Sequence, residues 1–271
     1  MNKEQTITGV IRGTGACVPE RILDNKEIAG FVDTSDEWIR ERTGVRRRRI
    51  AEKETTVSMA CEAGRQAVEE AGILPGEIDM ILVATGSPDQ IFPCTACQVQ
   101  EALGADGAVG FDLNAACSGF LFAYNTAQAY IASGIYRTVL VIGSESISRM
   151  VDWTDRGTCI LFGDGAGAVL LQAAEGKTYR PAAHSDGSGG PALTGPGVRN
   201  RIRSIDKDGR EAKTEYITMN GKDVFQFAVR KVPQVIQEVL KENELSVEDI
   251  DWFVLHQANA RIVDAVARRL H

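Results

Sequence analysis

The sequence has few of the residues that hold metals or build disulfide frameworks. Its 271 residues include six cysteines and three histidines. Six cysteines in a chain of this length do not make a disulfide scaffold, so we expect reduced thiols, most of them buried. Cys94 and Cys97 form a C-x-x-C pair, but the sequence has no second such pair to complete a zinc site. We therefore expect no metal site and interpret this pair as two small side chains in a helix core.

The chain also lacks long apolar runs and a targeting segment. No window reaches the ~18 consecutive apolar residues of a membrane helix. The start, MNKEQTITGV, has no basic stretch leading into an apolar one, which argues against a signal peptide. The net charge of −7 argues against general nucleic-acid binding. These absences predict a cytoplasmic protein that has neither a membrane nor a nucleic acid as its partner.

The patterns that are present indicate an α/β protein. Apolar runs alternate with helical periodicities, and the near-continuous Val/Ile/Leu content of the runs is typical of sheets covered on both faces. The predicted strands are ITGVIRG (7–13), DMILVAT (79–85), AVGFDLN (108–114), TVLVIGS (138–144) and AVLLQA (168–173). Helices are predicted over 57–72 and 117–134, and the second places Phe120, Ala127 and Ile131 on one face.

A stretch of the N-terminal half is echoed near the end of the chain. AVEEAGILPGEID, Ala67 to Asp79, matches VLKENELSVEDID, Val239 to Asp251, as a helix end, a turn and Ile-Asp before an apolar strand. The echo indicates two related βα halves with a site where they meet. Residues 185–215, rich in glycine, proline and charge, form a loop or boundary. The glycine-rich run Phe162 to Ala168 precedes a strand, so we interpret it as a turn or tight packing rather than a phosphate cradle.

Cys117 lies where the strand 108–114 runs into a helix that we expect to begin at Cys117 or Ser118. A thiol there faces unpaired backbone N–H groups and the positive end of the helix dipole, which favour thiolate. A small cysteine packed at a strand–helix junction fits these residues equally well. His256 ends the predicted strand DWFVLHQAN (251–259) at the equivalent point of the second half. A cysteine and a histidine at matching strand ends are what a cysteine acyltransferase needs.

Four stretches together resemble one family. They are TSDEWIRERTGVRRRRIA (34–51), AACSGF (115–120), FGDGAGA (162–168) and LHQANARI (255–262). They are similar to β-ketoacyl-acyl-carrier-protein synthase III, the initiating condensing enzyme of bacterial fatty-acid synthesis in the thiolase superfamily. The motif W-I-x-x-R-T-G at Trp38 to Gly44 is more selective than the cysteine motif. The resemblance implies a thiolase-like α-β-α-β-α architecture from two duplicated halves, 1–180 with the nucleophile and 181–271 with the histidine, the second incomplete.

The resemblance also implies a mechanism and roles for individual residues. In the first implied step, Cys117 takes the acyl group from an acyl-CoA. Malonyl-acyl-carrier protein then loses CO₂, and the resulting enolate attacks the acyl-cysteine. A neutral His256 donates a hydrogen bond to the malonyl thioester carbonyl. The implied CoA contacts are Trp38, Arg42, Arg156 and Asn259. The implied docking face for the carrier protein consists of Arg261, Arg268 and Arg269. The candidates for the acyl pocket, where core packing is an equal explanation, are Phe92 and Phe162. A homodimer is implied, and no cofactor is needed beyond these substrates.

The segment around Trp38 has structural explanations as well. Thr34 and Glu37 fit a helix capping box. The planar guanidinium of Arg156 suits stacking, with Trp38, on an adenine ring. The segment also contains a basic cluster, which consists of Arg40, Arg42 and Arg46 to Arg49. Binding of anionic CoA, binding of an acidic carrier protein or simple solvation would each explain this cluster.

Two features of the family fall outside this sequence: an asparagine of a G-N-T-S-type motif that pairs with the histidine, and a glycine-rich turn that adds an oxyanion donor. We therefore expect a truncated chain in which condensation is impaired. The alternatives are a polyketide synthase-like condensing enzyme, a thiolase with its second cysteine in the missing part, and an inactive form that acts only as a binding protein. The W-I-x-x-R-T-G motif points away from type III polyketide synthases, and acylation of Cys117 would separate any enzyme from a binding protein.

Overall fold

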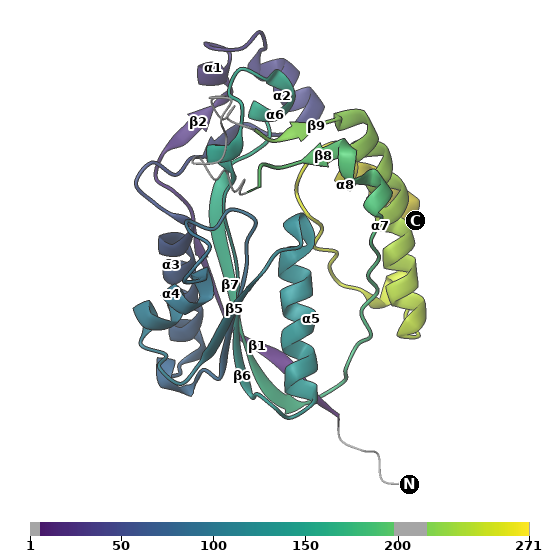
Figure 1. The fold of residues 1–271 in the computed structure, drawn as a ribbon. Coiled ribbons are helices and arrows are strands. Elements are labelled where there is room, and N and C mark those ends of the chain that lie inside the picture. The colour runs from purple at the N-terminus through teal and green to yellow at the C-terminus, as the bar shows by residue number, and fades with distance from the viewer. Residues whose placement is uncertain (1–5, 198–215, 271) are drawn as a thin grey trace, which may run out of the picture. The chain divides into compact units, whose positions relative to one another are not determined.

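A computed structural model describes residues 6–197 and 216–270 of the chain (Figure 1). The chain divides into two compact units, each assembled from three segments. The first unit contains Met1–Leu23, Arg48–Ile147 and Gly163–Pro181. The second unit contains Asp24–Arg47, Ser148–Phe162 and Ala182–His271. The predicted halves are contiguous in sequence, whereas both units draw on segments from across the chain.

A five-stranded mixed sheet forms the centre of the first unit, with the strand order β1-β7-β6-β4-β5. Its strands are β1 (Ile7–Cys17), β4 (Met80–Ala84), β5 (Val109–Leu113), β6 (Thr138–Ser146) and β7 (Asp164–Glu175). Strand β4 pairs in parallel with β5 and β6, while β7 is antiparallel to β6 and β1. The carboxyl ends of β4, β5 and β6 therefore meet at one edge of the sheet.

Helices cover both faces of this sheet (Figure 1). Helices α3 (Thr56–Ala71) and α4 (Thr95–Leu103) lie on one face, and α5 (Gly119–Ala132) lies on the other. Successive residues of a strand point to opposite faces, so Ile81 of β4 packs with α3 and α4 while Leu82 packs with α5. This double burial explains why the strands read as continuous apolar runs.

Glycines bring α3 against β1 in this unit. A Cβ on Gly13 would lie 2.1 Å from the carbonyl oxygen of Ala67, and one on Gly15 would lie 2.0 Å from that of Ala63. No side chain fits at these separations, so the helix backbone rests directly on the strand. The contact fixes α3 against β1, one outer strand of the sheet, while Cys117 follows β5, the outer strand on the opposite side.

The second unit is mainly helical. Its helices are α1 (Asn25–Ile28), α2 (Asp36–Thr43), α6 (Arg156–Cys159), α7 (Gly221–Glu242) and α8 (Ala260–Leu270). Its strands β8 (Leu193–Thr194) and β9 (Thr218–Met219) form an antiparallel pair. Strands β2 (Ile22–Asp24) and β3 (Arg47–Arg49) pair with each other, and most of their residues belong to the first unit. Within residues 6–197 and 216–270, no helix has the length and apolar content needed to cross a membrane.

The structure contains the five strands and two helices predicted above. Strand β7 begins at Asp164, so most of the glycine-rich run lies inside a strand. Helix α5 begins at Gly119, two residues after the earlier of the predicted starts. The echo is present in part. Helices α3 and α7 are each followed by a 3₁₀ turn, Pro75–Glu77 and Val247–Asp249, but a strand follows only the first of these turns. Part of the predicted loop, 198–215, lies outside the described residues.

The strand predicted over 251–259 is wrong. These residues form neither helix nor strand, and Trp252 and Val254 are 86% and 87% exposed. A strand needs a neighbour to complete its backbone hydrogen bonds, and no strand that the structure describes pairs with this segment. An apolar run alone therefore did not produce a strand here.

Candidate active site

Cys117 follows β5 at the sheet edge where the carboxyl ends of β4, β5 and β6 meet. The backbone N–H of Thr85, just after β4, donates to the carbonyl oxygen of Leu113 at the end of β5 at 3.1 Å. Glu145 lies near the end of β6. Open α/β sheets bind their ligands outside the carboxyl ends of parallel strands. Cys117 is thus at the edge where a ligand is expected.

A strained turn presents Cys117. The turn is a 3₁₀ segment, Ala116–Ser118, so Cys117 precedes α5 instead of starting it. Ala116 has a φ of 47°, in the left-handed region that residues other than glycine rarely adopt. The side-chain oxygen of Asn114 accepts the N–H of Ala116 at 3.2 Å and holds the turn. Conformations of this kind cost about 1–3 kcal/mol and concentrate at functional sites.

A carboxyl group lies beside this turn. Glu145 accepts hydrogen bonds from the N–H of Gly86 at 2.8 Å and from the hydroxyl of Thr85 at 3.4 Å, and it is in close contact with the hydroxyl of Ser87. Across the described ranges, no lysine, arginine or histidine forms an ion pair with it. Burial raises the pKa of Glu145 in spite of these donors. The group joins the loop after β4 to the end of β6.

The electrostatic environment of Cys117 differs from the predicted one. Desolvation raises the pKa of Cys117, and the nearby Glu145 raises it further, although a backbone N–H partly opposes them. The prediction that the helix terminus favours thiolate receives no support for the resting site, because desolvation has the largest influence on this pKa and favours the thiol. Cys117 therefore rests as a thiol and loses its proton when it attacks.

Replacing Glu145 by glutamine is expected to make Cys117 more acidic. Glutamine keeps an acceptor for Gly86 and Ser87 but removes a charge that is present in the alkaline range, where the thiol titrates. The pKa of Cys117 should fall, because one of the two influences that raise it has been removed. The pH dependence of its alkylation by iodoacetamide, followed by mass spectrometry, measures this shift. Glu145→Asp, which keeps the charge, is the control, and an unshifted profile in Glu145→Gln would contradict the expectation.

Helix α2 carries Trp38 in the second unit. Its N-cap is Ser35, whose hydroxyl accepts the N–H of Trp38 at 3.1 Å, so the capping box predicted from Thr34 is wrong by one residue. The hydroxyl oxygen of Thr34 is buried and has no hydrogen-bond partner within the described residues. The helix ends at Gly44, where φ is 80° and a Cβ would lie 2.7 Å from that of Ala260. Glycine at this position permits both the turn and the approach of α8.

Two guanidinium groups lie close to the ring of Trp38. The guanidinium carbon of Arg156 is 4.8 Å from the ring centroid, and that of Arg42 is 5.4 Å away. Arg156, on α6, also donates to the carbonyl oxygen of Asp33 at 2.8 Å. The structure therefore brings together three of the four residues predicted to contact CoA. Arg156 stacks directly on Trp38, so its guanidinium has to move for an adenine ring to enter between them.

The fourth predicted CoA residue, Asn259, makes structural contacts. Its side-chain nitrogen donates to the carbonyl oxygen of Arg42 at 3.1 Å, and its side-chain oxygen accepts the N–H of Arg261 at 2.9 Å. The side chain thus caps α8 and joins it to α2. These contacts place Asn259 next to helix α2, which carries Trp38. They also give both the nitrogen and the oxygen of its side-chain amide a hydrogen-bond partner.

His256 lies in the irregular segment just before α8. Desolvation by nearby protein atoms lowers the pKa of His256, which favours the neutral imidazole at pH 7. A neutral imidazole carries one N–H donor and one acceptor. In the described part of the chain neither ring nitrogen has a hydrogen-bond partner. Cys117 belongs to the first unit and His256 to the second.

The arginines predicted to dock a carrier protein are exposed on α8, and two of them contact α7. The guanidinium of Arg261 lies over the ring of Phe225 at 5.4 Å, and Arg269 donates to the carbonyl oxygen of Val229. These two side chains help to hold α8 against α7. Arg268 is exposed in the last turn of the helix.

Neither phenylalanine predicted for the acyl pocket is enclosed. Phe92 is 84% exposed in the loop before α4, and Phe162, at the end of a second-unit segment, is only partly buried. The structure therefore gives no support to an acyl pocket at these two side chains, and the assignment stays a prediction.

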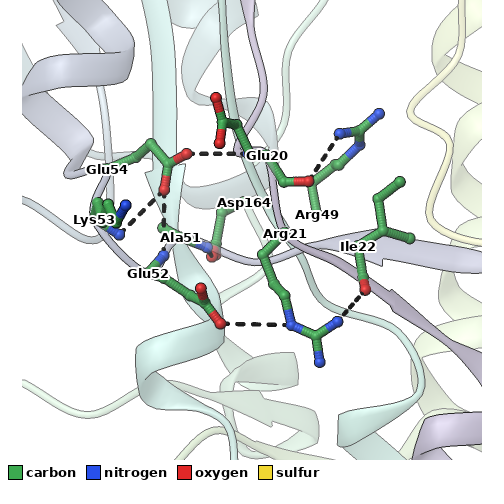
Figure 2. Close-up of polar contacts among 9 residues, drawn as sticks. All are labelled: Glu20, Arg21, Ile22, Arg49, Ala51, Glu52, Lys53, Glu54 and Asp164. Carbon is green, nitrogen blue, oxygen red and sulfur yellow. Dashed lines mark hydrogen bonds and ion pairs between the residues drawn. The ribbon is translucent and has the colours of Figure 1, made fainter.

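The predicted basic cluster divides into arginines with different surroundings. Arg48 is buried. Arg49 donates to the carbonyl oxygen of Pro19 at 3.0 Å and to that of Glu20 at 3.4 Å, and Figure 2 shows the second of these contacts. Figure 2 also shows the adjoining loop, in which Glu54 accepts backbone N–H groups of residues 20, 52 and 53, and Asp164 accepts that of Ala51. Arg48 and Arg49 are thus part of the fold rather than of a solvated basic surface.

The sequence analysis did not identify Glu145, Asn114 or the strained Ala116. A signal for the first of these was available, because a carboxyl residue at the end of an apolar strand is a candidate wherever parallel strands end together. Which strands end together depends on the strand order, and the sequence did not provide that order.

Comparison with known proteins gives concordant results. A model of the family "3-Oxoacyl-[acyl-carrier-protein (ACP)] synthase III" matches residues 111–187, and a model of its C-terminal part matches residues 240–271. The β-ketoacyl-[acyl-carrier-protein] synthase III of Erythrobacter litoralis is 48% identical over 266 residues, which cover 97% of this chain and 81% of that protein.

Solved structures agree with this likeness. The crystal structure of 3-oxoacyl-[acyl-carrier-protein] synthase III from Aquifex aeolicus has a TM-score of 0.87 and 42% identity, covering 97% of this chain and 80% of that one. The priming β-ketosynthase of the R1128 polyketide biosynthetic pathway has a TM-score of 0.89 and 36% identity, covering 100% of this chain and 80% of that one. The predicted thiolase-like α/β fold is confirmed. Nearly half of the residues are shared with a curated synthase along almost the whole chain, and this protein belongs to the β-ketoacyl-[acyl-carrier-protein] synthase III family of fatty-acid acyltransferases.

Proposed function

We propose that the chain condenses an acyl-CoA primer with malonyl-acyl-carrier protein through an acyl-cysteine at Cys117. The observation that carries the proposal is the strained turn that presents Cys117 at the carboxyl edge of the sheet in a member of this family. The sulfur of Cys117 attacks the thioester carbonyl carbon, the bond from that carbon to the CoA sulfur breaks, and CoA leaves with the cysteine proton. The raised pKa of Cys117 requires this proton to depart during the attack.

His256 serves the second half of the proposed reaction. The malonyl group loses CO₂, and the resulting enolate carbon attacks the acyl carbonyl, breaks its bond to the sulfur of Cys117 and forms the β-ketoacyl product. Negative charge develops on the malonyl thioester oxygen before this attack. An imidazole N–H that donates to that oxygen stabilises it. The lowered pKa of His256 supports this role, because the group is then a neutral donor at pH 7.

Trp38, Arg42 and Arg156 bind the nucleotide end of CoA in this proposal. Replacing Trp38 by alanine removes the ring on which both guanidinium groups stack. An adenine ring held between Trp38 and Arg156 makes two stacking contacts. At ~0.5–1 kcal/mol each, the loss of both should raise the KM for acyl-CoA about 5- to 30-fold while kcat changes little. Steady-state kinetics with a short acyl-CoA measure this change.

A matched control for this variant is Phe31→Ala, which removes an exposed aromatic ring that contacts Trp153 in the same unit. Phe31→Ala should leave the KM near its starting value. An equal rise in both variants would indicate general destabilisation, and an unchanged KM in Trp38→Ala would remove the ring from the CoA site.

The carrier protein docks on the exposed face of α8 in this proposal. Arg268→Glu should weaken the apparent affinity for malonyl-carrier protein about 3- to 10-fold at low salt and leave acylation of Cys117 unchanged. Lys241→Glu, the same charge change in the last turn of α7, is the control. The KM for malonyl-carrier protein at two salt concentrations measures the effect. Equal effects of the two reversals would reject a specific docking face.

A homodimer and a cytoplasmic location belong to the same proposal. Strand β5 lies at the edge of the five-stranded sheet, where a second copy can add its own strand. Light scattering at micromolar protein concentration tests the dimer, and the mass of a monomer would oppose it.

The direct test of the function supplies acyl-CoA and malonyl-carrier protein and follows the β-ketoacyl-carrier product by mass spectrometry. Failure to release CoA and CO₂ in parallel with product would overturn the proposal. The likeness to a priming β-ketosynthase favours one second candidate, the same condensation on a polyketide-type carrier. Parallel assays with fatty-acid-type and polyketide-type carrier proteins distinguish the two, because the better substrate identifies the pathway.

A further inference from the structure

Cys94 packs against the core of the first unit, as the sequence suggested, but Cys97 does not belong to that core. Cys94 is the N-cap residue of α4, and Cys97 is in the first turn of the helix. Cys94 is partly buried and Cys97 is exposed. Their sulfur atoms are 3.4 Å apart, and the thiol of Cys94 donates to that of Cys97. Two thiols in contact at the surface form a pair that the proposed condensation does not use.

A cavity of about 310 Å³ opens beside Cys97. Its lining consists of Pro93, Cys97, Gln98, Gln100, Glu101 and Asp106. The two charged side chains in this lining are both acidic. The hydrogen bond from Cys94 raises the pKa of Cys97, as do desolvation and the negative charge of Asp112. The surroundings therefore disfavour anions and leave room for a small uncharged or cationic molecule.

The residues between the two cysteines are firmly held. The N–H groups of Thr95 and Ala96 each donate to the carboxylate of Asp112 on β5 at 2.8 Å. The backbone between the two cysteines is thus fixed. Closing a disulfide requires the sulfurs to move from 3.4 Å to about 2.05 Å, a change within reach of side-chain rotation.

We propose that Cys94 and Cys97 form a reversible disulfide by exchange with a small disulfide of neutral or positive charge that enters this cavity. Cys97 attacks first, because it is exposed and lines the cavity. Its thiolate bonds to one sulfur of the small disulfide, whose S–S bond breaks and releases one thiol after protonation. The thiolate of Cys94 then attacks the sulfur of Cys97, breaks the mixed disulfide and releases the second thiol. The protein loses two electrons and two protons, which the small disulfide gains.

The test uses cystamine, a cationic disulfide, on a Cys117→Ser background. In that background Cys94 and Cys97 are the only cysteines of the tryptic fragment 66–137. The fragment should lose the mass of two hydrogens after treatment and regain it with dithiothreitol. Cys94→Ser should stop at a mixed disulfide on Cys97, and Cys97→Ser should react about 10-fold more slowly or not at all. Unchanged thermal midpoints show that these variants are folded.

A second experiment tests whether the charge of the oxidant affects the rate of the reaction. Cystamine should react several-fold faster than oxidised glutathione, which is anionic, and the ratio should shrink at high salt and in the double variant Glu101→Gln, Asp106→Asn. A wild-type pair that keeps both thiols, or a mixed disulfide that Cys94 never resolves, would overturn the proposal. Equal rates for the two oxidants would overturn the role of the cavity. Because Cys117 is absent from these assays, the outcome is independent of the proposed condensation.

Discussion

Transfer of an acyl group from acyl-CoA to the protein should disappear when Cys117 is replaced by alanine. The variant has no nucleophile on the strained turn, and loss of a covalent nucleophile typically costs about 10⁴-fold or more in rate. Intact-mass spectrometry after incubation with acetyl-CoA or a branched acyl-CoA measures the result. The unaltered protein should gain the mass of one acyl group, and Cys117→Ala should gain none.

Two further variants make this result specific. Cys97→Ala removes another exposed thiol of the first unit and should load normally. Cys117→Ser keeps a hydroxyl that is a much weaker nucleophile than the thiol, and it should load very slowly. An acyl adduct on Cys117→Ala would assign the nucleophile to another residue and would contradict the proposed mechanism.

Replacing His256 by alanine should separate the two halves of the reaction. Loading of Cys117 involves no charge on the malonyl thioester, so it should change by no more than about twofold. Condensation should fall about 10²- to 10³-fold, the usual cost of losing one donor to a developing oxyanion. Release of CO₂ from malonyl-carrier protein by pre-acylated enzyme measures the second half. Equal loss in both halves would point to a damaged fold instead.

The pH dependence tests the protonation state of His256. Its pKa lies below the ordinary value of about 6.5, and the neutral form is the one proposed to act. The rate of condensation should therefore rise as the pH increases through this lowered pKa. Titration of His256 should cause no further change in the rate across neutral pH. His256→Gln keeps an N–H donor that does not titrate, so it should retain partial activity without the acidic limb. An acidic limb that persists in His256→Gln would belong to another group.

Local patterns predicted much of the first unit because they report directly on burial. The apolar runs around Leu82 and Leu140 are continuous because helices cover both faces of the sheet, and continuity of that kind is visible in the sequence. The W-I-x-x-R-T-G motif likewise located Trp38, whose partner Arg42 lies one helical turn away. Arg156 was placed beside them by resemblance, since more than a hundred residues separate it from α2.

The features that sequence analysis missed depend on long-range packing. Glu145 lies beside Cys117 because Ala84 of β4 pairs with both Leu113 and Gly143, which brings the ends of three strands together. The pKa of Cys117 was predicted from the helix terminus, a local feature, whereas its direction comes mainly from desolvation by the surrounding protein, which depends on the tertiary structure. The failed strand at Trp252 has the same origin, because a strand exists only where a partner strand is present.

The backbone conformation of Ala116 lowers the stability of the fold but helps to hold the Cys117 sulfur in place for reaction. A glycine would adopt its φ of 47° without steric cost, and a β-branched residue there would be strained further. Selection for heat resistance alone would therefore favour glycine at this position, at the expense of a stiffer turn that holds the sulfur in place. That an alanine occupies it means that the fold maintains a locally unfavourable backbone just before its nucleophile. Among related proteins, alanine at this position should accompany selection for rapid turnover, and glycine should accompany selection for thermal stability.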